Sequence, residues 1–210
     1  MTGRNSRTAL AKAPRVRTAQ LTRNTKETQI ELELHIDGGE VHIDTPVPFF
    51  SHMLDAFACH GRFGLRLKAR GDIEVDPHHL IEDTGIVLGR ALKQALGGEY
   101  RGIERAGSFS FAMDGTLTTV ALDLCGRPTL VWGLKFGPHP IGNLDPNLFR
   151  DFYKGLADNA GAALHVHCLA QDNDHHLVES AMKGLGRALR RACQPLPGNQ
   201  LLSTKGVIDG

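Results

Sequence analysis

The chain contains two similar segments separated by 97 positions, and this repeat restricts its fold more than any other feature. HHLIEDTGIVLGRALKQA begins at His78, and HHLVESAMKGLGRALRRA begins at His175. Ten of the eighteen aligned positions are identical, including both histidines and one glutamate. We infer that the chain is a duplicated unit and that each copy ends in the same helix.

Hydrophobic periodicity predicts a similar order of elements in both halves. TQIELELHI alternates like a half-buried strand, and PFFSHMLDAFACHG has helical spacing. In the first half we predict strands at 28–36 and 41–44, a helix at 48–61, a strand from 64 and a helix from 78 to about 96. In the second half we predict strands at 107–115, 119–126 and 129–136, a helix at 145–161, a strand at 162–170 and a helix at 175–193. The DGG turn before residue 41 predicts that the first two strands form a hairpin.

The repeated order of strand, strand, helix, strand and helix predicts an α+β fold. Two sheets would each be covered on one face by helices, and a pseudo-twofold axis would relate the halves. We divide the chain into a basic tail at 1–22, a first half at 23–100, a second half at 101–196 and a C-terminal tail at 197–210. Seven basic residues precede the first acidic residue, Glu27, which is typical of a disordered tail. A transit peptide is the alternative.

The composition argues against several classes of protein. The formal net charge of the 210 residues is +1, so nothing at the level of the whole chain indicates binding to nucleic acid. No apolar run is long enough to span a bilayer, and the N-terminus lacks the apolar core of a secretory signal. The four cysteines are far apart and form no CxxC motif. They predict reduced thiols in a cytoplasmic protein. From the net charge and the lack of an apolar span we expect no nucleic-acid and no membrane partner.

The spacing of the HHxxE motif predicts two metal ions rather than one. On a helix, His78 and His79 diverge by about 100°, while Glu82 lies within about 60° of both. Two imidazoles that diverge this far do not easily chelate one small ion, but they can each serve a different ion. The same triplet recurs as His175, His176 and Glu179. The recurrence favours a symmetric dinuclear site or paired mononuclear sites over a solvated helix start.

The repeat also indicates a third ligand position on the shorter helix of each half. FFSHML in the first half matches LFRDFY in the second, so His52 corresponds to Asp151. Aspartate is a competent hard ligand, although a solvated acid on a helix surface explains Asp151 equally well. Imidazole and carboxylate donors without thiolate leave zinc, manganese, iron, cobalt or nickel, of which zinc is the most common at such sites.

A second group of candidate residues is basic and suits a phosphate. Arg105 follows the first repeat, Arg127 lies at a strand end in CGRPTL, and STKG at 203–206 supplies Ser203 and Lys205. Hydroxyl, backbone amide and ammonium groups in a turn are typical phosphate donors. STKG alone would be a weak motif, but two arginines and a metal site in the same chain make a phosphorylated substrate a reasonable prediction.

Several motifs together resemble the imidazoleglycerol-phosphate dehydratase family of histidine biosynthesis. They are TKETQIELEL, PFFSHML, DPHHLIEDTGIVLGRAL, GIERAG, MDGTL, GRP, DNDHHLVESAMKGLGRALRRA and STKG. The likeness runs from about Arg23 to Val207. It implies a ribosomal protein S5 domain 2-like fold and dehydration of D-erythro-imidazole glycerol phosphate to imidazole acetol phosphate plus water. It also implies two Mn²⁺ ions per active site and a trimer-based assembly of 24 subunits with active sites between subunits.

The resemblance assigns roles to individual residues. The positions that match metal ligands or their surroundings are His52, His78, His79, Glu82, His175, His176 and Glu179. Those that match phosphate contacts are Arg105, Arg127, Ser203 and Lys205. Glu27 and Asp114 match acids near the reacting carbons, and Lys183 matches a lysine beside the second motif. The chain departs from the family at Ser51, in DGTL, and at Asp151, where several members have a metal-binding histidine.

The implied mechanism needs an electron sink, because the proton to be removed is not α to a carbonyl group. We expect two ions to hold the substrate ring as imidazolate, so that the ring expels the neighbouring hydroxyl through a diazafulvene-like intermediate. Glu27, Glu179 and Asp114 are candidates for the proton shuttle. A metal-dependent phosphohydrolase is the enzymatic alternative. A non-catalytic metal-binding or cage-forming protein is the other alternative, but it would have no use for the basic residues.

Overall fold

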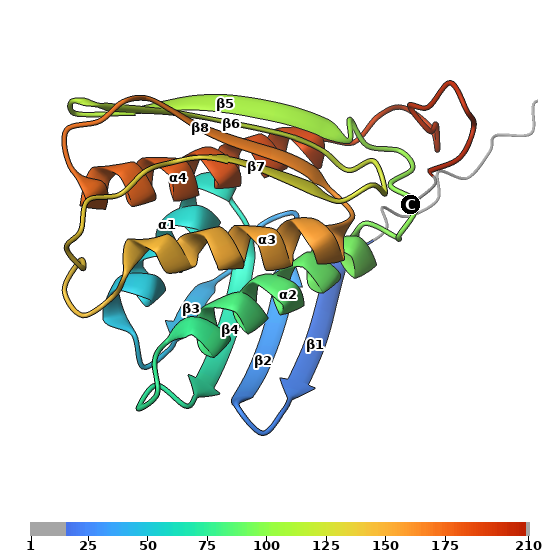
Figure 1. The fold of residues 1–210 in the computed structure, drawn as a ribbon. Coiled ribbons are helices and arrows are strands. Elements are labelled where there is room, and N and C mark those ends of the chain that lie inside the picture. The colour runs from blue at the N-terminus through green and yellow to red at the C-terminus, as the bar shows by residue number, and fades with distance from the viewer. Residues whose placement is uncertain (1–15, 209–210) are drawn as a thin grey trace, which may run out of the picture.

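The computed structural model describes residues 16–208 and has two four-stranded sheets with four α-helices between them (Figure 1). The elements of the first half are β1 (Thr18–Asn24), β2 (Thr28–His35), β3 (Val41–Asp44), α1 (Pro48–Gly61), β4 (Gly64–Gly71) and α2 (His78–Ala95). Those of the second half are β5 (Ala106–Met113), β6 (Thr116–Asp123), β7 (Thr129–Gly133), the 3₁₀ helix η1 (Pro146–Leu148), α3 (Phe149–Ala160), β8 (Ala163–Ala170) and α4 (Asp174–Ala192). The predicted α+β duplication is confirmed, and each unit has three strands before its first long helix, of which β1 was not predicted.

The two sheets have the same topology. The strand orders are β1-β2-β4-β3 and β5-β6-β8-β7. In the first sheet β1 pairs with β2 and β2 with β4, both antiparallel, and β3 pairs parallel with β4. In the second sheet β5, β6 and β8 pair antiparallel in the same way, and β7 pairs parallel with β8. The predicted hairpin between 28–36 and 41–44 is therefore wrong. β3 instead pairs with β4, and α1 supplies the crossover that a parallel pair needs.

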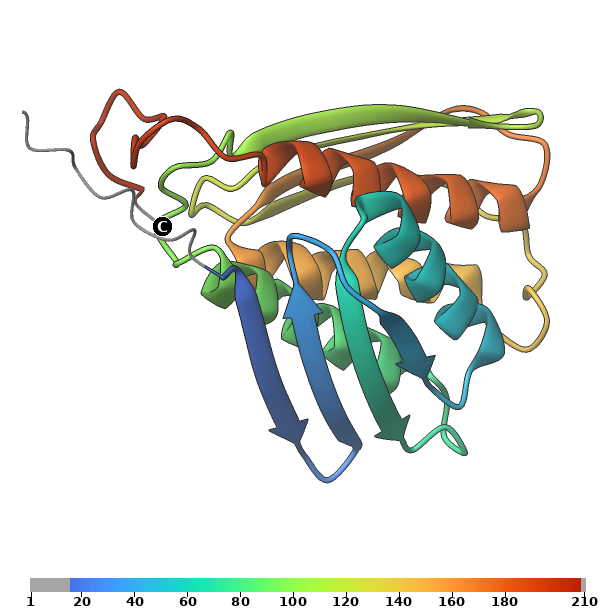
Figure 2. The same ribbon diagram turned by 180° about the vertical axis from the view of Figure 1, so that it is seen from behind.

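The N-terminal boundary also differs from the prediction. Thr18–Asn24 forms the edge strand β1, which pairs along its whole length with β2 (Figure 2). The part of the predicted disordered tail at 18–22 is therefore an ordered strand, whereas residues 1–15 lie outside the described part. Strand β1 escaped prediction because one of its inward positions is Arg23, which pairs with the buried Asp83 at 2.8 Å.

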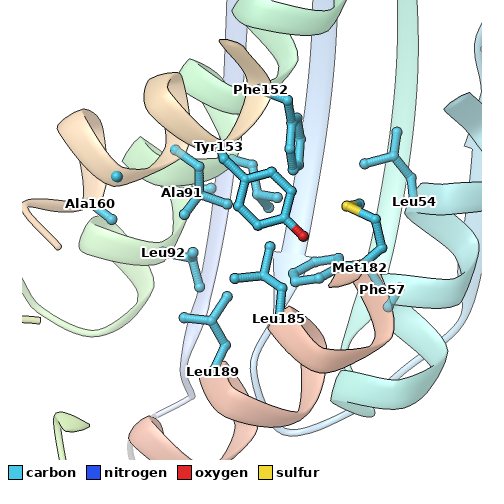
Figure 3. Packing of buried hydrophobic residues seen from close by; sticks show 14 of the residues in the cluster. Leu54, Phe57, Ala91, Leu92, Phe152, Tyr153, Ala160, Met182, Leu185 and Leu189 are labelled. Atoms are coloured by element: carbon cyan, nitrogen blue, oxygen red, sulfur yellow. The ribbon is translucent and has the colours of Figure 1, made fainter. Parts of the chain in front are cut away.

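The helices pack across the two halves of the chain. α1 of the first half contacts α4 of the second, and α3 of the second half contacts α2 of the first. Side chains from all four helices meet in one core, where Figure 3 shows Leu54, Leu92, Phe152 and Leu185 together. This cross-packing places residues of one half beside the HHxxE helix of the other. Among the described residues, no helix is both long and apolar enough to cross a membrane.

Candidate metal centres and phosphate site

The second HHxxE helix carries the tightest group of candidate metal ligands. Ligand atoms of His52, His175 and Glu179 all lie within 4.8 Å of one another. His175 Nε2 lies 3.2 Å from Glu179 Oε2, and His52 Nε2 lies 3.8 Å from Glu179 Oε1. His52 comes from α1, so the cross-packing of α1 on α4 assembles this group. We call His52, His175 and Glu179 the α4 cluster.

The first HHxxE helix carries the equivalent group. His78 Nε2 lies 3.6 Å from Glu82 Oε2, and His78 Nδ1 lies 3.5 Å from Asp151 Oδ2. Asp151 comes from α3, which packs on α2. We call His78, Glu82 and Asp151 the α2 cluster. The sequence match of His52 with Asp151 thus corresponds to equivalent places in space.

The second histidine of each motif points away from these clusters and is held by a carboxylate. His79 Nδ1 donates to Asp72 at 3.1 Å, and His176 Nδ1 donates to Asp172 at 3.0 Å. The bond to Asp72 is the largest cause that raises the pKa of His79. A histidine that donates Nδ1–H to a carboxylate presents Nε2 as a ligand, which is the usual arrangement behind metal-bound histidines.

Glu179 is the carboxylate of the α4 cluster and is buried, with 7% of its surface exposed. Burial raises the pKa of its carboxyl, but the hydrogen bond from Lys183 and the charge of Lys183 together lower this pKa by more than burial raises it. The net shift of the pKa is therefore downward. Lys183 Nζ lies 2.8 Å from Glu179 Oε1. The lysine therefore keeps Glu179 ionised and able to act as a ligand.

The two other candidate acids lie at equivalent hairpin tips. Glu27 is in the turn between β1 and β2, and Asp114 is in the turn between β5 and β6. Asp114 Oδ2 lies 3.6 Å from His176 Nε2. The charge of Glu27 contributes to the raised pKa of His79, after the larger effect of Asp72. Each hairpin thus brings one acid close to the second histidine of one motif.

The predicted phosphate residues converge in a separate pocket. Arg105, Arg127, Ser203 and Lys205 all line it, together with Cys125 and Thr204. Arg105 Nε donates to Asp123 at 3.0 Å, which orients the guanidinium. The Ser203 hydroxyl accepts from the Lys205 backbone at 3.2 Å and so shapes the STKG turn. Three cationic side chains in one pocket suit a phosphate dianion.

The phosphate pocket and the α4 cluster lie at opposite ends of helix α4. Arg105 N donates to the carbonyl of Ala192 at the end of α4, whereas His175 is at the beginning of that helix. The 19 residues of α4 therefore separate them by about 27 Å. Figure 1 shows the C-terminal segment beside the end of α4. A single chain does not bring the two groups together.

The family is settled by a match to the sequence model of imidazoleglycerol-phosphate dehydratase over residues 45–189. The chain belongs to this family. It is 47% identical to the imidazoleglycerol-phosphate dehydratase of Phenylobacterium zucineum, over 91% of this chain and 99% of the relative. It is 50% identical to the imidazoleglycerol-phosphate dehydratase of Geobacter metallireducens, again over 91% of this chain and 99% of the relative.

Solved structures of family members confirm the fold. The imidazoleglycerol-phosphate dehydratase of Staphylococcus aureus superposes with a TM-score of 0.77 at 31% identity, covering 85% of this chain and 99% of that one. The enzyme from Pyrococcus furiosus gives a TM-score of 0.76 at 35% identity, covering 89% and 99%. The chain is thus a dehydratase-family enzyme, and the rival phosphohydrolase and non-catalytic classes lose their support.

Two carboxylates of this dehydratase-family chain were not among the predicted site residues. Asp72 and Asp172 come seven and four residues before the histidines that they hold, and they differ in their distance from the motif. The repeat alignment therefore does not pair them. The sequence signal for both is an aspartate in the loop that leads into an HHxxE helix, but only the structure shows which loop aspartate faces the ring.

Proposed function

We propose that the chain dehydrates D-erythro-imidazole glycerol phosphate to imidazole acetol phosphate and water in histidine biosynthesis. The observation that carries the proposal is the pair of His–carboxylate clusters at corresponding positions of the repeat, each accompanied by a second histidine held through Nδ1. Family membership supplies the reaction type, and the separate phosphate pocket supplies the means to hold the ester.

The donor chemistry of the site fits two divalent ions, which we propose to be Mn²⁺. Both clusters offer imidazole nitrogen and carboxylate oxygen without thiolate, and Asp72 and Asp172 support outward-facing histidines. His52, His175 and Glu179 would hold one ion, and His78, Glu82 and Asp151 the other, while His79 and His176 would offer Nε2 as further donors outside these clusters. When bound, the ions would supply Lewis acidity toward the two nitrogens of the substrate ring.

We assign the proton transfer to the hairpin acids rather than to Glu179. Both oxygens of Glu179 are already engaged, one with Lys183 and one with His175. Glu27 and Asp114 lie on turns beside the second histidines, and within residues 16–208 neither has partners on both carboxylate oxygens. One of them would accept the carbon-bound proton and the other would protonate the departing hydroxyl. Lys183 then acts by keeping Glu179 ionised.

The distance between the two groups supports sites shared between copies of the chain. A substrate with a three-carbon backbone is far too short to bridge the length of α4. We therefore propose that Arg105, Arg127, Ser203 and Lys205 of one copy hold the phosphate while the metal clusters of other copies hold the ring. This arrangement agrees with an assembly of 24 subunits built from trimers, which the family resemblance suggests. Binding of the remote phosphate would orient the reacting end.

The test is turnover of imidazole glycerol phosphate by the purified, Mn²⁺-loaded protein. We expect imidazole acetol phosphate to form and no inorganic phosphate to be released. A loaded protein that leaves the substrate unchanged would overturn the proposal, and release of phosphate with an intact carbon skeleton would favour a phosphohydrolase. Metal analysis should find about two ions per chain, of which His78→Ala and His175→Ala should each remove about one.

A further inference from the structure

Asp172 makes more polar contacts than it would need to hold the His176 ring alone. Its carboxylate accepts from His176 Nδ1 at 3.0 Å and also from the Thr116 hydroxyl. The backbone N–H of Gly115 donates to Oδ2 at 3.3 Å, and that of Asn173 donates to Oδ1 at 2.7 Å. Gly115 and Thr116 directly follow Asp114 in the β5–β6 turn. One carboxylate thus joins a candidate metal ligand to the turn that carries a candidate acid.

The first half of the chain divides these tasks between two residues. Asp72 accepts from His79 Nδ1, whereas the β1–β2 turn is tied to α2 by Thr28, whose hydroxyl donates to Asp83 at 2.5 Å. Thr28 is the first residue of β2, as Thr116 is the first residue of β6. The two hairpins are therefore held at equivalent threonines by different acids.

The second half has no aspartate at the position that matches Asp83. The repeat places Ser180 at the position of Asp83, and the Ser180 hydroxyl donates within its own helix to the carbonyl of Leu177 at 3.2 Å. Thr116, which is 1% exposed, therefore depends on Asp172 for a partner. A buried threonine hydroxyl without a partner would be costly.

We propose that Asp172 is a positioning residue that fixes His176 and Asp114 relative to each other. The His176 ring is held through Nδ1, which leaves Nε2 facing Asp114 Oδ2 at 3.6 Å. The Asp114 turn is held through Gly115 and Thr116, so the Asp172 carboxylate contacts both groups, and the side chain of Asn173 also lies 2.8 Å from His176 Nδ1. The catalytic consequence of this coupling rests on the proposed function, but the coupling itself does not.

The experiment compares Asp172→Ala, Thr116→Val and the control Glu40→Gln in the full-length protein. Glu40 carries an exposed ion pair with Arg66 and lies in the loop between β2 and β3, in the other half of the chain from these groups. Hydrogen exchange of the 113–116 turn is measured first, without metal. We expect faster exchange of the Gly115 amide in Asp172→Ala and in Thr116→Val, and no change in Glu40→Gln.

Mn²⁺ titration and kinetics then separate the two contacts. Asp172→Ala should weaken binding of one ion by about 10- to 100-fold, the usual effect of removing a carboxylate behind a metal-bound histidine. Thr116→Val keeps the His176 contact, so it should lower kcat while Mn²⁺ affinity stays within about 2-fold of the starting protein. Asp172→Asn, which keeps an acceptor oxygen, should rescue the turn but only part of the metal affinity.

The proposal is overturned if the Asp172 variants bind both ions like the starting protein, or if turn exchange in Asp172→Ala is unchanged. If Asp172→Ala does not fold, Thr116→Val and Asp172→Asn decide the question through the same two measurements. A starting protein that binds Mn²⁺ but does not dehydrate the substrate would overturn the proposed function alone, since exchange and titration would still report on Asp172.

Discussion

His52 and Asp151 occupy equivalent positions in the two halves, and each lies beside the HHxxE helix of the other half. His52 Nε2 is 3.8 Å from Glu179 Oε1, and Asp151 Oδ2 is 3.5 Å from His78 Nδ1. The two clusters therefore use corresponding sequence positions but differ in arrangement, because His52 faces the glutamate of its motif and Asp151 faces the first histidine. They also differ in charge, because the α2 cluster has two carboxylates and the α4 cluster has one. The symmetry of the fold is not matched by symmetry of the ligands.

This difference predicts that the two sites differ in metal preference. Asp151→Ala should weaken one of two Mn²⁺ sites by about 10-fold or more, because it removes a proposed ligand. Asp151→His should keep both sites but shift the α2 cluster toward Zn²⁺, since imidazole suits zinc and carboxylate suits manganese. Competition titration with Mn²⁺ and Zn²⁺ measures both effects.

Asp158→Asn is the matched control for Asp151, because Asp158 lies on the same helix and pairs only with Lys154 at the surface. It should leave both affinities unchanged. Equal behaviour of Asp151→Ala and Asp158→Asn would show that Asp151 is a solvated acid.

Substitutions in the phosphate pocket should weaken binding of the substrate without changing the affinity for metal. Arg127→Ala or Lys205→Ala should raise KM for the phosphate ester by about 10- to 100-fold, because each removes a charged hydrogen-bond donor worth about 1.5–3 kcal/mol. Mn²⁺ affinity should not change, since the pocket lies at the far end of α4. Lys93→Ala, at an exposed position on α2, is the control. An unchanged KM in both pocket variants would remove the pocket from the proposed site.

Close helix packing predicts a strong effect of a small substitution. Gly89 is identical in both copies of the repeat, and a Cβ at this position would lie 2.5 Å from the carbonyl oxygen of Leu156 on α3. Gly89→Ala should lower the free energy of unfolding by about 1–3 kcal/mol through overpacking, despite the better helix propensity of alanine. In Gly184→Ala the new Cβ would meet a Val120 methyl at 3.1 Å, so we expect a smaller loss. Thermal unfolding of the two variants compares them, and equal losses would argue against backbone contact as the cause.

Much of the fold could be predicted because the repeat carries information from one half to the other. The HHxxE helices, the equivalence of His52 and Asp151, and most strands follow from periodicity and alignment. β1 was missed because Arg23 takes an inward position that strands usually give to an apolar residue. The pairing of β3 was missed because a local turn favours a hairpin, whereas the crossover through α1 depends on packing that periodicity does not encode.

The candidate site was predictable in residue type but not in its assembly. No pattern along the chain indicates that α1 packs on α4, which is what joins His52 to Glu179. The roles of Asp72 and Asp172 depend on loop conformation, because two aspartates closely precede each motif and only one of each two contacts the ring of the second histidine. The distance between the phosphate pocket and the clusters also requires the length and direction of α4.

Two buried tyrosines give a matched test of the core. Tyr100 and Tyr153 are each 1% exposed. The Tyr100 hydroxyl donates to the carbonyl of Ala160, whereas the Tyr153 hydroxyl has no hydrogen-bond partner among the described residues. Tyr100→Phe should lower the free energy of unfolding by about 1 kcal/mol, because it leaves a buried carbonyl unpaired.

Tyr153→Phe should leave stability unchanged or raise it by up to about 1 kcal/mol, because it removes a buried polar group that gains nothing from the protein. Figure 3 shows this hydroxyl directed into the apolar core between the helices. Urea unfolding of both variants, followed by circular dichroism, gives the two changes on one scale. If Tyr153→Phe destabilises as much as Tyr100→Phe, the Tyr153 hydroxyl must be paired, for which a buried water is the remaining partner.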